Sequence, residues 1–156
     1  LRRSEPVAPE ALAPVLAALG LAPQRVRAAR WLDNGPTWLG VRVDAADTVL
    51  ALEPDHAALK TLAKVGVVGP HPAGAECAFE VRGFAAPVGI TEDPVTGSLN
   101  ASLAQWLIGE GVAPPRYVAA QGTRLARAGR VHVEREGDTV WIGGGAITCL
   151  RGEAAF

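Results

Sequence analysis

The chain has 156 residues, of which 49% are hydrophobic and 20% are charged. This size and composition fit one globular domain with a substantial core and exclude an intrinsically disordered chain. The 15 lysines and arginines nearly balance the 16 aspartates and glutamates, so we expect no nucleic-acid partner bound through phosphate neutralisation. No apolar run has the length of a membrane span and nothing at the start resembles a secretion signal, so we expect no membrane partner. With only two cysteines, a cytoplasmic location is the default expectation.

Two further compositional features concern the extent of the chain and its thiols. The sequence contains no methionine and opens with Leu-Arg-Arg, so we expect it to be the later part of a longer polypeptide. Its two cysteines, Cys77 and Cys149, are too few for a disulfide framework. We expect both thiols to lie in the core rather than to act as nucleophiles.

In chain order, apolar spacing and turn residues predict alternating helices and strands. The predicted helices cover residues 6–19, a stretch that starts after an N-cap at Asp55 and reaches Val65, and residues 98–109. The predicted strands cover residues 26–31, 37–43, 48–52, 77–84, 117–120, 130–135, 139–142 and 147–151, with a short hydrophobic piece at 67–72. This pattern predicts a single α+β domain over residues 1–156.

The helix predicted at 98–109 lacks a clear polar face. Large apolar side chains lie nearly all round it, among them Leu99, Leu103 and Trp106. A helix of this kind is surrounded by protein. We therefore predict a sheet curled around a central buried helix.

The residues just before this helix, 92–98, form the best candidate for a functional site. The first N–H groups of a helix lack intrahelical partners, and its dipole favours an anion there. Gly97 permits close approach of a ligand, and Thr96 and Ser98 can add hydroxyl donors. Asp93 lies beside this start and is suited to acid–base chemistry. The alternative is structural, with the aspartate and hydroxyl side chains serving only as helix caps.

The segment Glu92-Asp-Pro-Val-Thr-Gly-Ser98 resembles the signature E-D-P-x-T-G-S of the phenazine-biosynthesis PhzF-like family, relatives of diaminopimelate epimerase. The likeness covers most of the chain, in the family's order. It includes Asp33-Asn-Gly-Pro36, Phe84-Ala-Ala-Pro87, Gln121-Gly122 and Gly143-Gly-Gly-Ala-Ile-Thr148.

The resemblance implies one half of a diaminopimelate epimerase-like pseudo-dimer, in which two similar halves enclose the active site. This chain resembles the second, C-terminal half. Asp93 then corresponds to the second-half acid–base aspartate, and Gly97 and Ser98 correspond to positions that hold a substrate carboxylate. Neither a cofactor nor a metal is implied. The epimerase branch uses a cysteine where this chain has Asp93, so thiol-based racemisation is not expected.

The glutamate and Gly-His-Pro motif of the family's first half are not found in this sequence. We therefore expect an N-terminal half or a second subunit to complete the cleft, and we expect a homo-oligomer. The function implied is a cofactor-independent isomerase or epimerase that moves a proton on a small carboxylated metabolite. The alternative is a non-catalytic small-molecule-binding, structural or oligomerisation domain.

Overall fold

One mixed β-sheet runs through the chain, and the computed structural model describes residues 1–153 and 155. Within these residues the strand order is β1-β2-β3-β4-β5-β7-β8-β9, and β6 pairs with β5 beside this path. The strands are β1 (Arg3–Pro6), β2 (Val26–Asp33), β3 (Thr37–Val43), β4 (Val65–Pro70), β5 (Phe79–Ala85), β6 (Ile90–Asp93), β7 (Arg116–Gln121), β8 (Gly129–Glu136) and β9 (Thr139–Gly143). The β3–β4 and β5–β7 pairs are parallel and the others are antiparallel. The predicted α+β class is confirmed.

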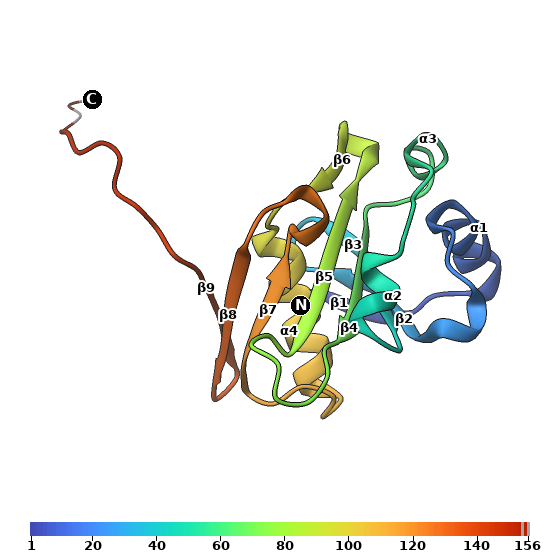
Figure 1. The fold of residues 1–156 in the computed structure, drawn as a ribbon, viewed down its shortest axis with the longest axis horizontal. Coiled ribbons are helices and arrows are strands. Elements are labelled where there is room, and N and C mark those ends of the chain that lie inside the picture. The colour runs from blue at the N-terminus through green and yellow to red at the C-terminus, as the bar shows by residue number, and fades with distance from the viewer. Residues whose placement is uncertain (154, 156) are drawn as a thin grey trace.

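Helices lie on both faces of this sheet (Figure 1). They are α1 (Pro9–Leu19), α2 (Ala46–Leu50), α3 (His56–Leu59) and α4 (Gly97–Gly109), with 3-10 turns η1 (Pro23–Arg25), η2 (Ala86–Val88) and η3 (Thr123–Leu125). Helices α1, α2 and α3 share one hydrophobic cluster, and α4 belongs to a second. In the described part of the chain, no helix combines the length and hydropathy that crossing a membrane requires.

Strand alternation divides the buried side chains of the central strands between these two clusters. In β3, Leu39 and Val41 pack with α1 and α2, whereas Trp38 packs with α4. In β4, Val67 faces the first cluster and Val68 faces the second. The sheet therefore has no solvent-facing side at its centre, which explains why β4 is a continuous apolar run.

The strand predicted at 48–52 is wrong, because residues 48–50 belong to α2 (Ala46–Leu50) and the rest of the segment is not a strand. The β-branched pair Thr48 and Val49 is typical of a strand, but β3 and β4 are parallel neighbours. Parallel neighbours need a crossover connection that carries the chain back along the sheet. Helices α2 and α3 form that crossover, and Asp55 caps α3 as predicted by accepting a hydrogen bond from Ala58 N–H at 3.0 Å. The predicted extension of this helix to Val65 is wrong, because α3 ends at Leu59 and Val65 begins β4.

The strand predicted at 147–151 is also wrong. Beyond β9 the residues up to 153 have no regular structure and leave the body of the fold (Figure 1). Ile147 is 90% exposed, and Cys149 is exposed rather than in the core. The alternating pattern at this position lacks an adjacent strand among the described residues. By contrast, Cys77 is buried as expected.

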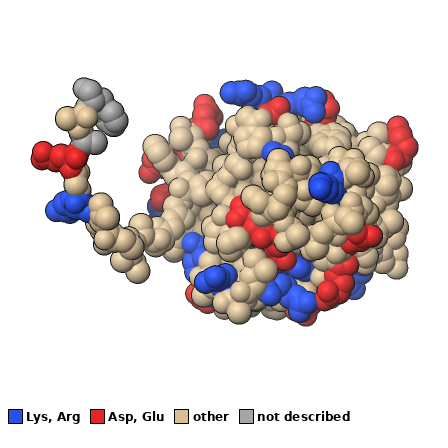
Figure 2. All heavy atoms as spheres, turned by 90° about the horizontal axis from the view of Figure 1, so that it is seen from above, with Lys and Arg blue, Asp and Glu red and all other residues tan. Residues whose placement is uncertain are grey.

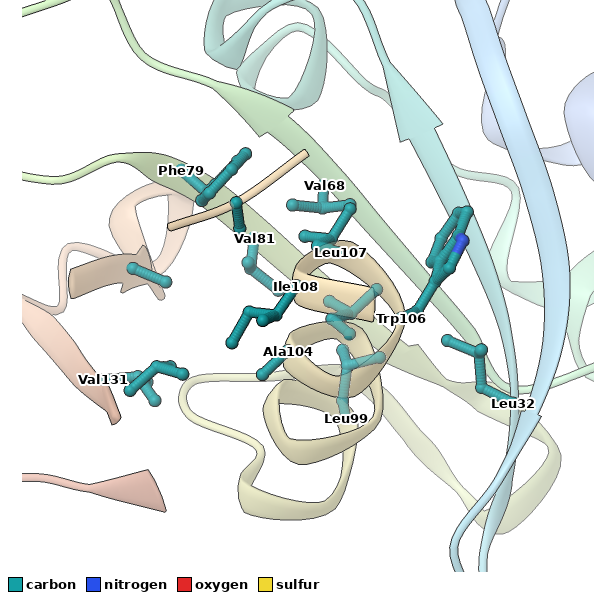
Figure 3. Packing of buried hydrophobic residues seen from close by; sticks show 14 of the residues in the cluster. Leu32, Val68, Phe79, Val81, Leu99, Ala104, Trp106, Leu107, Ile108 and Val131 are labelled. Carbon is teal, nitrogen blue, oxygen red and sulfur yellow. The ribbon is translucent and has the colours of Figure 1, made fainter. Parts of the chain in front are cut away.

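Helix α4 is enclosed by side chains along most of its circumference, as predicted. Leu99, Leu103 and Leu107 are each at most 1% exposed. Leu32 of β2 and Val131 of β8 lie on opposite sides of the helix (Figure 3). A narrow stripe with helical spacing, which contains Ser98, Ala101, Gln105 and Gly109, is half-buried or exposed. The sequence did not indicate this stripe, because its residues are small or flanked by apolar neighbours.

Three glycines allow α4 to approach the sheet closely. Gly40, Gly66 and Gly83 lie opposite one another in register across β3, β4 and β5. A Cβ atom on Gly66 would overlap Leu99 Cδ1, and one on Gly83 would lie 3.0 Å from Thr96 Oγ1. Gly66 and Gly83 therefore allow the close approach of the amino end of α4, and Gly40 allows that of Leu103 and Trp106.

We expect Gly66→Val to lower the free energy of unfolding by about 1–3 kcal/mol, because the added side chain overpacks the core against the fully buried Leu99. Chemical denaturation followed by circular dichroism measures this. Gly109→Ala is the matched control, since a Cβ there meets open space. It should be neutral or stabilising by up to about 1 kcal/mol. Equal stability of Gly66→Val and the native chain would contradict this account of the packing.

Candidate functional site

The predicted site residues come together in the turn between β6 and α4. Asp93 is the last residue of β6 and lies opposite Gly83 of β5. Gly97 is the first residue of α4, and Thr96 is its N-cap. Strand pairing and helix packing thus fix both ends of a three-residue turn, 94–96. Asp93, Thr96, Gly97 and Ser98 all lie at this one corner of the fold.

A hydroxyl group orients the Asp93 carboxylate. Thr96 Oγ1 donates a hydrogen bond to Asp93 Oδ2 at 2.9 Å. Thr96 is buried and Asp93 is half-buried. One carboxylate oxygen of Asp93 is therefore bonded within the protein, while the side chain as a whole remains partly exposed to solvent. An aspartate held in this way can present its other oxygen to a ligand.

The amino end of α4 is open. No side chain caps it, and the N–H groups of Gly97 and Ser98 have no acceptor among the described residues. A Cβ built on Gly97 meets nothing within 4 Å. The purely structural alternative, in which aspartate or hydroxyl oxygens cap the helix, is therefore not what the structure shows. Two free donors and the positive end of the helix dipole therefore lie beside Asp93.

Ser98 is held by the turn between β2 and β3. Asn34 Nδ2 donates to Ser98 O at 2.9 Å, and Trp38 Nε1 donates to Ser98 Oγ at 3.2 Å. The sequence predicted a turn at 33–36, and the structure adds that this turn contacts the start of α4. Asn34 and Trp38 therefore position the helix start, a role that spacing along the chain did not reveal.

Gln121 connects the parts of the site and was not predicted as a site residue. Its side chain is fully buried at the end of β7. Its Oε1 accepts from Thr96 N–H at 3.0 Å and from Asn100 Nδ2 at 2.7 Å. Its Nε2 donates to Asp93 O at 2.9 Å and to Thr96 Oγ1 at 3.0 Å. All four hydrogen-bonding positions of the amide are thus used, and the direction of every bond is consistent with Thr96 donating onward to Asp93.

We expect Gln121→Glu to lower the free energy of unfolding by about 2–4 kcal/mol, because it removes two donors and places a charge in a buried network. Urea denaturation measures the loss. Gln105→Glu, the same change at a half-buried position on α4, is the control and should stay within about 0.5 kcal/mol. The assigned role of Gln121 would fail if the two variants were equally stable.

Glu92, the residue before Asp93, has a structural partner. Arg82 of β5 forms a two-pronged ion pair with it, with Nε–Oε1 at 3.0 Å and Nη2–Oε2 at 2.8 Å. Arg82 Nη1 also donates to Leu52 O at 2.7 Å. Both charged side chains are more than nine-tenths buried. This pair joins β6 to β5, and Arg82 also binds the crossover just after α2. Both contacts help to fix the position of Asp93, the next residue after Glu92.

The surface and the remaining reactive residues do not add to this corner. Burial raises the pKa of the Cys77 thiol, which favours its neutral form. No group of three His, Cys, Asp or Glu residues with metal-site geometry occurs in the portion of the chain that the structure describes. On the face seen in Figure 2, basic and acidic side chains are interspersed rather than gathered by sign.

Comparison with known proteins gives the family of this fold and site. The family model described as "Phenazine biosynthesis-like protein" (PhzC-PhzF) matches residues 3–152. An uncharacterized isomerase of Pseudomonas aeruginosa is 38% identical over 112 residues, which are 72% of this chain and 42% of that protein. Antisense-enhancing sequence 1 of Schizosaccharomyces pombe is 32% identical over 135 residues, which are 79% of this chain and 45% of that protein.

Solved structures agree. A PhzF-family phenazine biosynthesis protein of Enterococcus faecalis superposes with a TM-score of 0.74 at 29% identity, covering 97% of this chain and 54% of that one. The fold alone is shared with a PhzF-family protein of Bacillus anthracis, with a TM-score of 0.72 at 17% identity over 90% of this chain and 52% of that one. This chain spans less than half the length of the two relatives matched by sequence. It belongs to the PhzC/PhzF family of phenazine biosynthesis-like proteins.

Proposed function

We propose that the chain is the C-terminal half of a cofactor-independent isomerase or epimerase that acts by acid–base proton transfer on a small carboxylated metabolite. The observation that carries the proposal is the Asp93 carboxylate, oriented by Thr96, beside two free N–H groups at an open helix start. Membership of a family whose relatives include an uncharacterized isomerase supports the reaction class.

In this proposal each residue of the corner has a separate role. The N–H groups of Gly97 and Ser98 bind the substrate carboxylate, where the helix dipole stabilises its charge. Asp93 delivers or accepts a proton at the carbon next to an electron-withdrawing group, with a group of the other half as the opposing acid or base. Thr96 was expected to bind substrate. Since its hydroxyl and N–H groups are already bonded within the protein, we assign it to positioning Asp93.

The length of the chain relative to its relatives supports the proposed assembly. A first half, or a second subunit in its place, would close a cleft over the corner formed by Asp93 and α4. Each half would be a sheet curled around its central helix, and the complete protein would form a cytoplasmic homo-oligomer. The coverage of 42–54% of the matched proteins supports a two-half arrangement.

Deuterium incorporation from heavy water into a panel of small amino and hydroxy acids tests the proposal. We expect incorporation by this chain joined to the first half that its own coding sequence supplies, and little or none by the 156-residue chain alone. If the coding sequence upstream of Leu1 supplies no such half and no subunit complements the chain, the non-catalytic binding or structural role replaces the enzymatic one.

We expect small anions to bind at the start of α4 in this chain alone. Sulfate or acetate titration followed by amide NMR should shift the Gly97, Ser98 and Leu99 signals, because these groups face the anion. Gly97→Val should remove binding by steric blockage and leave the fold intact, since a Cβ at this position meets open space. Gly109→Ala, at the opposite end of the same helix, is the control. Unmoved Gly97 and Ser98 amides at saturating sulfate would contradict the assignment.

A further inference from the structure

Gly122, the residue after Gln121, packs against the turn that precedes α4. It directly follows β7, is buried, and has a φ of +88°. A Cβ atom at this position would lie 2.7 Å from Pro94 O, in the residue after Asp93. A contact this short with a backbone oxygen would force one of the two segments to move. Glycine is therefore required here by lack of space as well as by the left-handed backbone.

The other end of the loop at 122–129 contacts the same turn. A Cβ atom on Gly129, the first residue of β8, would lie 2.6 Å from Val95 Cγ2. Between the two glycines the loop closes on itself, because two of its backbone N–H groups donate to Gly122 O at 2.9 and 3.0 Å. The loop therefore bears on two consecutive residues of the turn, Pro94 and Val95.

The strand behind Gly122 is held more firmly than the turn in front of it. Gln121, the last residue of β7, is fully buried and lies in the strand pairing with both β5 and β8. Pro94 and Val95 are exposed and belong to a three-residue turn. A Cβ atom added to Gly122 should therefore displace the turn rather than the end of β7.

We propose that Gly122 is a positioning residue, which sets the place of the 94–96 turn and thereby the direction of the Asp93 carboxylate; this rests on the proposed function of Asp93 as the acid–base group. The turn joins Asp93 to Thr96. The Thr96 hydroxyl donates to Asp93 Oδ2 at 2.9 Å, and the Thr96 N–H donates to Gln121 Oε1 at 3.0 Å. A displaced turn changes the geometry of both bonds.

The N–H groups that we propose bind the substrate carboxylate are held from another direction. Asn34 Nδ2 and Trp38 Nε1 both donate to Ser98, from the turn between β2 and β3 and from β3 itself. A displaced 94–96 turn should therefore move Asp93 more than it moves the Ser98 N–H. Gly122 thus acts on proton transfer rather than on binding of the carboxylate.

Gly122→Ala and Gly89→Ala form a matched pair that tests the proposal. The two glycines have φ of +88° and +86° and ψ of 4° and 7°, so alanine is equally strained at both. A Cβ on Gly89, however, meets nothing within 4 Å. In the two-half protein, Gly122→Ala should lower kcat for deuterium exchange at least about tenfold, because a small misplacement of a reacting group is costly. Sulfate affinity at Gly97 and Ser98 should change less than about threefold, and Gly89→Ala should keep both native values.

Amide NMR of the 156-residue chain tests the positioning without turnover. Gly122→Ala should shift the Val95 and Thr96 amide signals, which adjoin Gly122 in space and not in sequence, whereas Gly89→Ala should not. Native Val95 and Thr96 signals in Gly122→Ala, or a native kcat, would overturn the proposal. A parallel fall of kcat and sulfate affinity would also overturn it, because the whole corner would then be lost. If the native two-half protein exchanges no deuterium, the proposed function fails instead, and the amide signals still decide whether Gly122 positions the turn.

Val95→Ala keeps the test decisive if Gly122→Ala does not fold. It removes the methyl groups that pack toward Gly129 and so loosens the same turn without adding an atom. We expect a kcat at least about threefold lower, with sulfate affinity within about threefold of native. Val112→Ala makes the same change at a similarly exposed valine after α4 and should leave kcat unaltered. A native kcat for Val95→Ala would show that the loop does not position Asp93.

Discussion

The variant Leu103→Asp should yield no folded, soluble protein. Leu103 is 1% exposed and lies midway along α4, within the cluster that joins the helix to the sheet. An unpaired carboxylate at that position costs several kcal/mol, in addition to the lost packing. A domain of this size is stable by only about 5–15 kcal/mol, so the change removes most or all of that margin. Solubility after expression, circular dichroism and thermal melting measure the outcome.

Two controls separate charge from shape in this experiment. Leu103→Met conserves volume and should cost less than about 1.5 kcal/mol. Gln105→Asp introduces the same charge two residues further along α4, at the half-buried stripe, and should fold. Recovery of soluble, cooperatively melting Leu103→Asp protein would show that α4 is not the central packing element of this fold.

The burial of α4 could be predicted because it depends on a local pattern. Leu99, Leu103 and Leu107 repeat at helical spacing, Trp106 and Ile108 add large apolar side chains beside them, and no charged residue occurs in 97–109. The row formed by Gly40, Gly66 and Gly83 could not be predicted. These glycines are separated by 26 and 17 residues, and only the strand register brings them together. Composition indicates that a glycine is present, but it does not show which helix needs the space.

The site shows the same division between local and long-range information. The motif at residues 92–98 gave Asp93, Thr96, Gly97 and Ser98 as neighbours, because a turn and a helix start are local structures. Gln121 and Asn34 were missed as site residues, since each reaches the motif through a contact across the sheet or from a distant turn. The signals for both residues were their places in the family resemblance, in Asp33-Asn-Gly-Pro36 and Gln121-Gly122. These segments also fit ordinary loops, and the resemblance did not give either residue a role.

The strand prediction at 48–52 followed local propensity, whereas the topology of the sheet determines the structure of this segment. Thr48 and Val49 favour a strand by themselves, but the parallel pairing of β3 with β4 requires a connection that crosses back over the sheet. Thr48 Oγ1 donates to Asp44 Oδ1 at 2.7 Å, and Arg25 Nη2 donates to the same hydroxyl. These bonds stabilise the first turn of α2. Strand order, and with it this helix, is not encoded in the segment itself.

Asp93→Asn should reduce the rate of deuterium exchange by the two-half protein by about 10²–10⁴-fold, the usual contribution of one acid–base group. Asparagine keeps the size of the side chain and can still accept the hydrogen bond that Thr96 Oγ1 donates to Asp93 Oδ2 at 2.9 Å. It cannot carry the proton. Anion binding at Gly97 and Ser98 should be unchanged or stronger, because the neighbouring negative charge is removed. The loss should therefore fall on kcat and not on affinity for the carboxylate.

Asp138→Asn makes the same change on the exposed turn between β8 and β9 and should leave both turnover and anion binding unaltered. This comparison separates loss of a proton carrier from any general effect of net charge. If Asp93→Asn in the two-half protein turns over substrate at the native rate while remaining folded, Asp93 is not the acid–base group. If turnover falls only together with sulfate binding at Gly97 and Ser98, the carboxylate orders the helix start rather than transferring a proton, because a proton carrier would leave that binding intact.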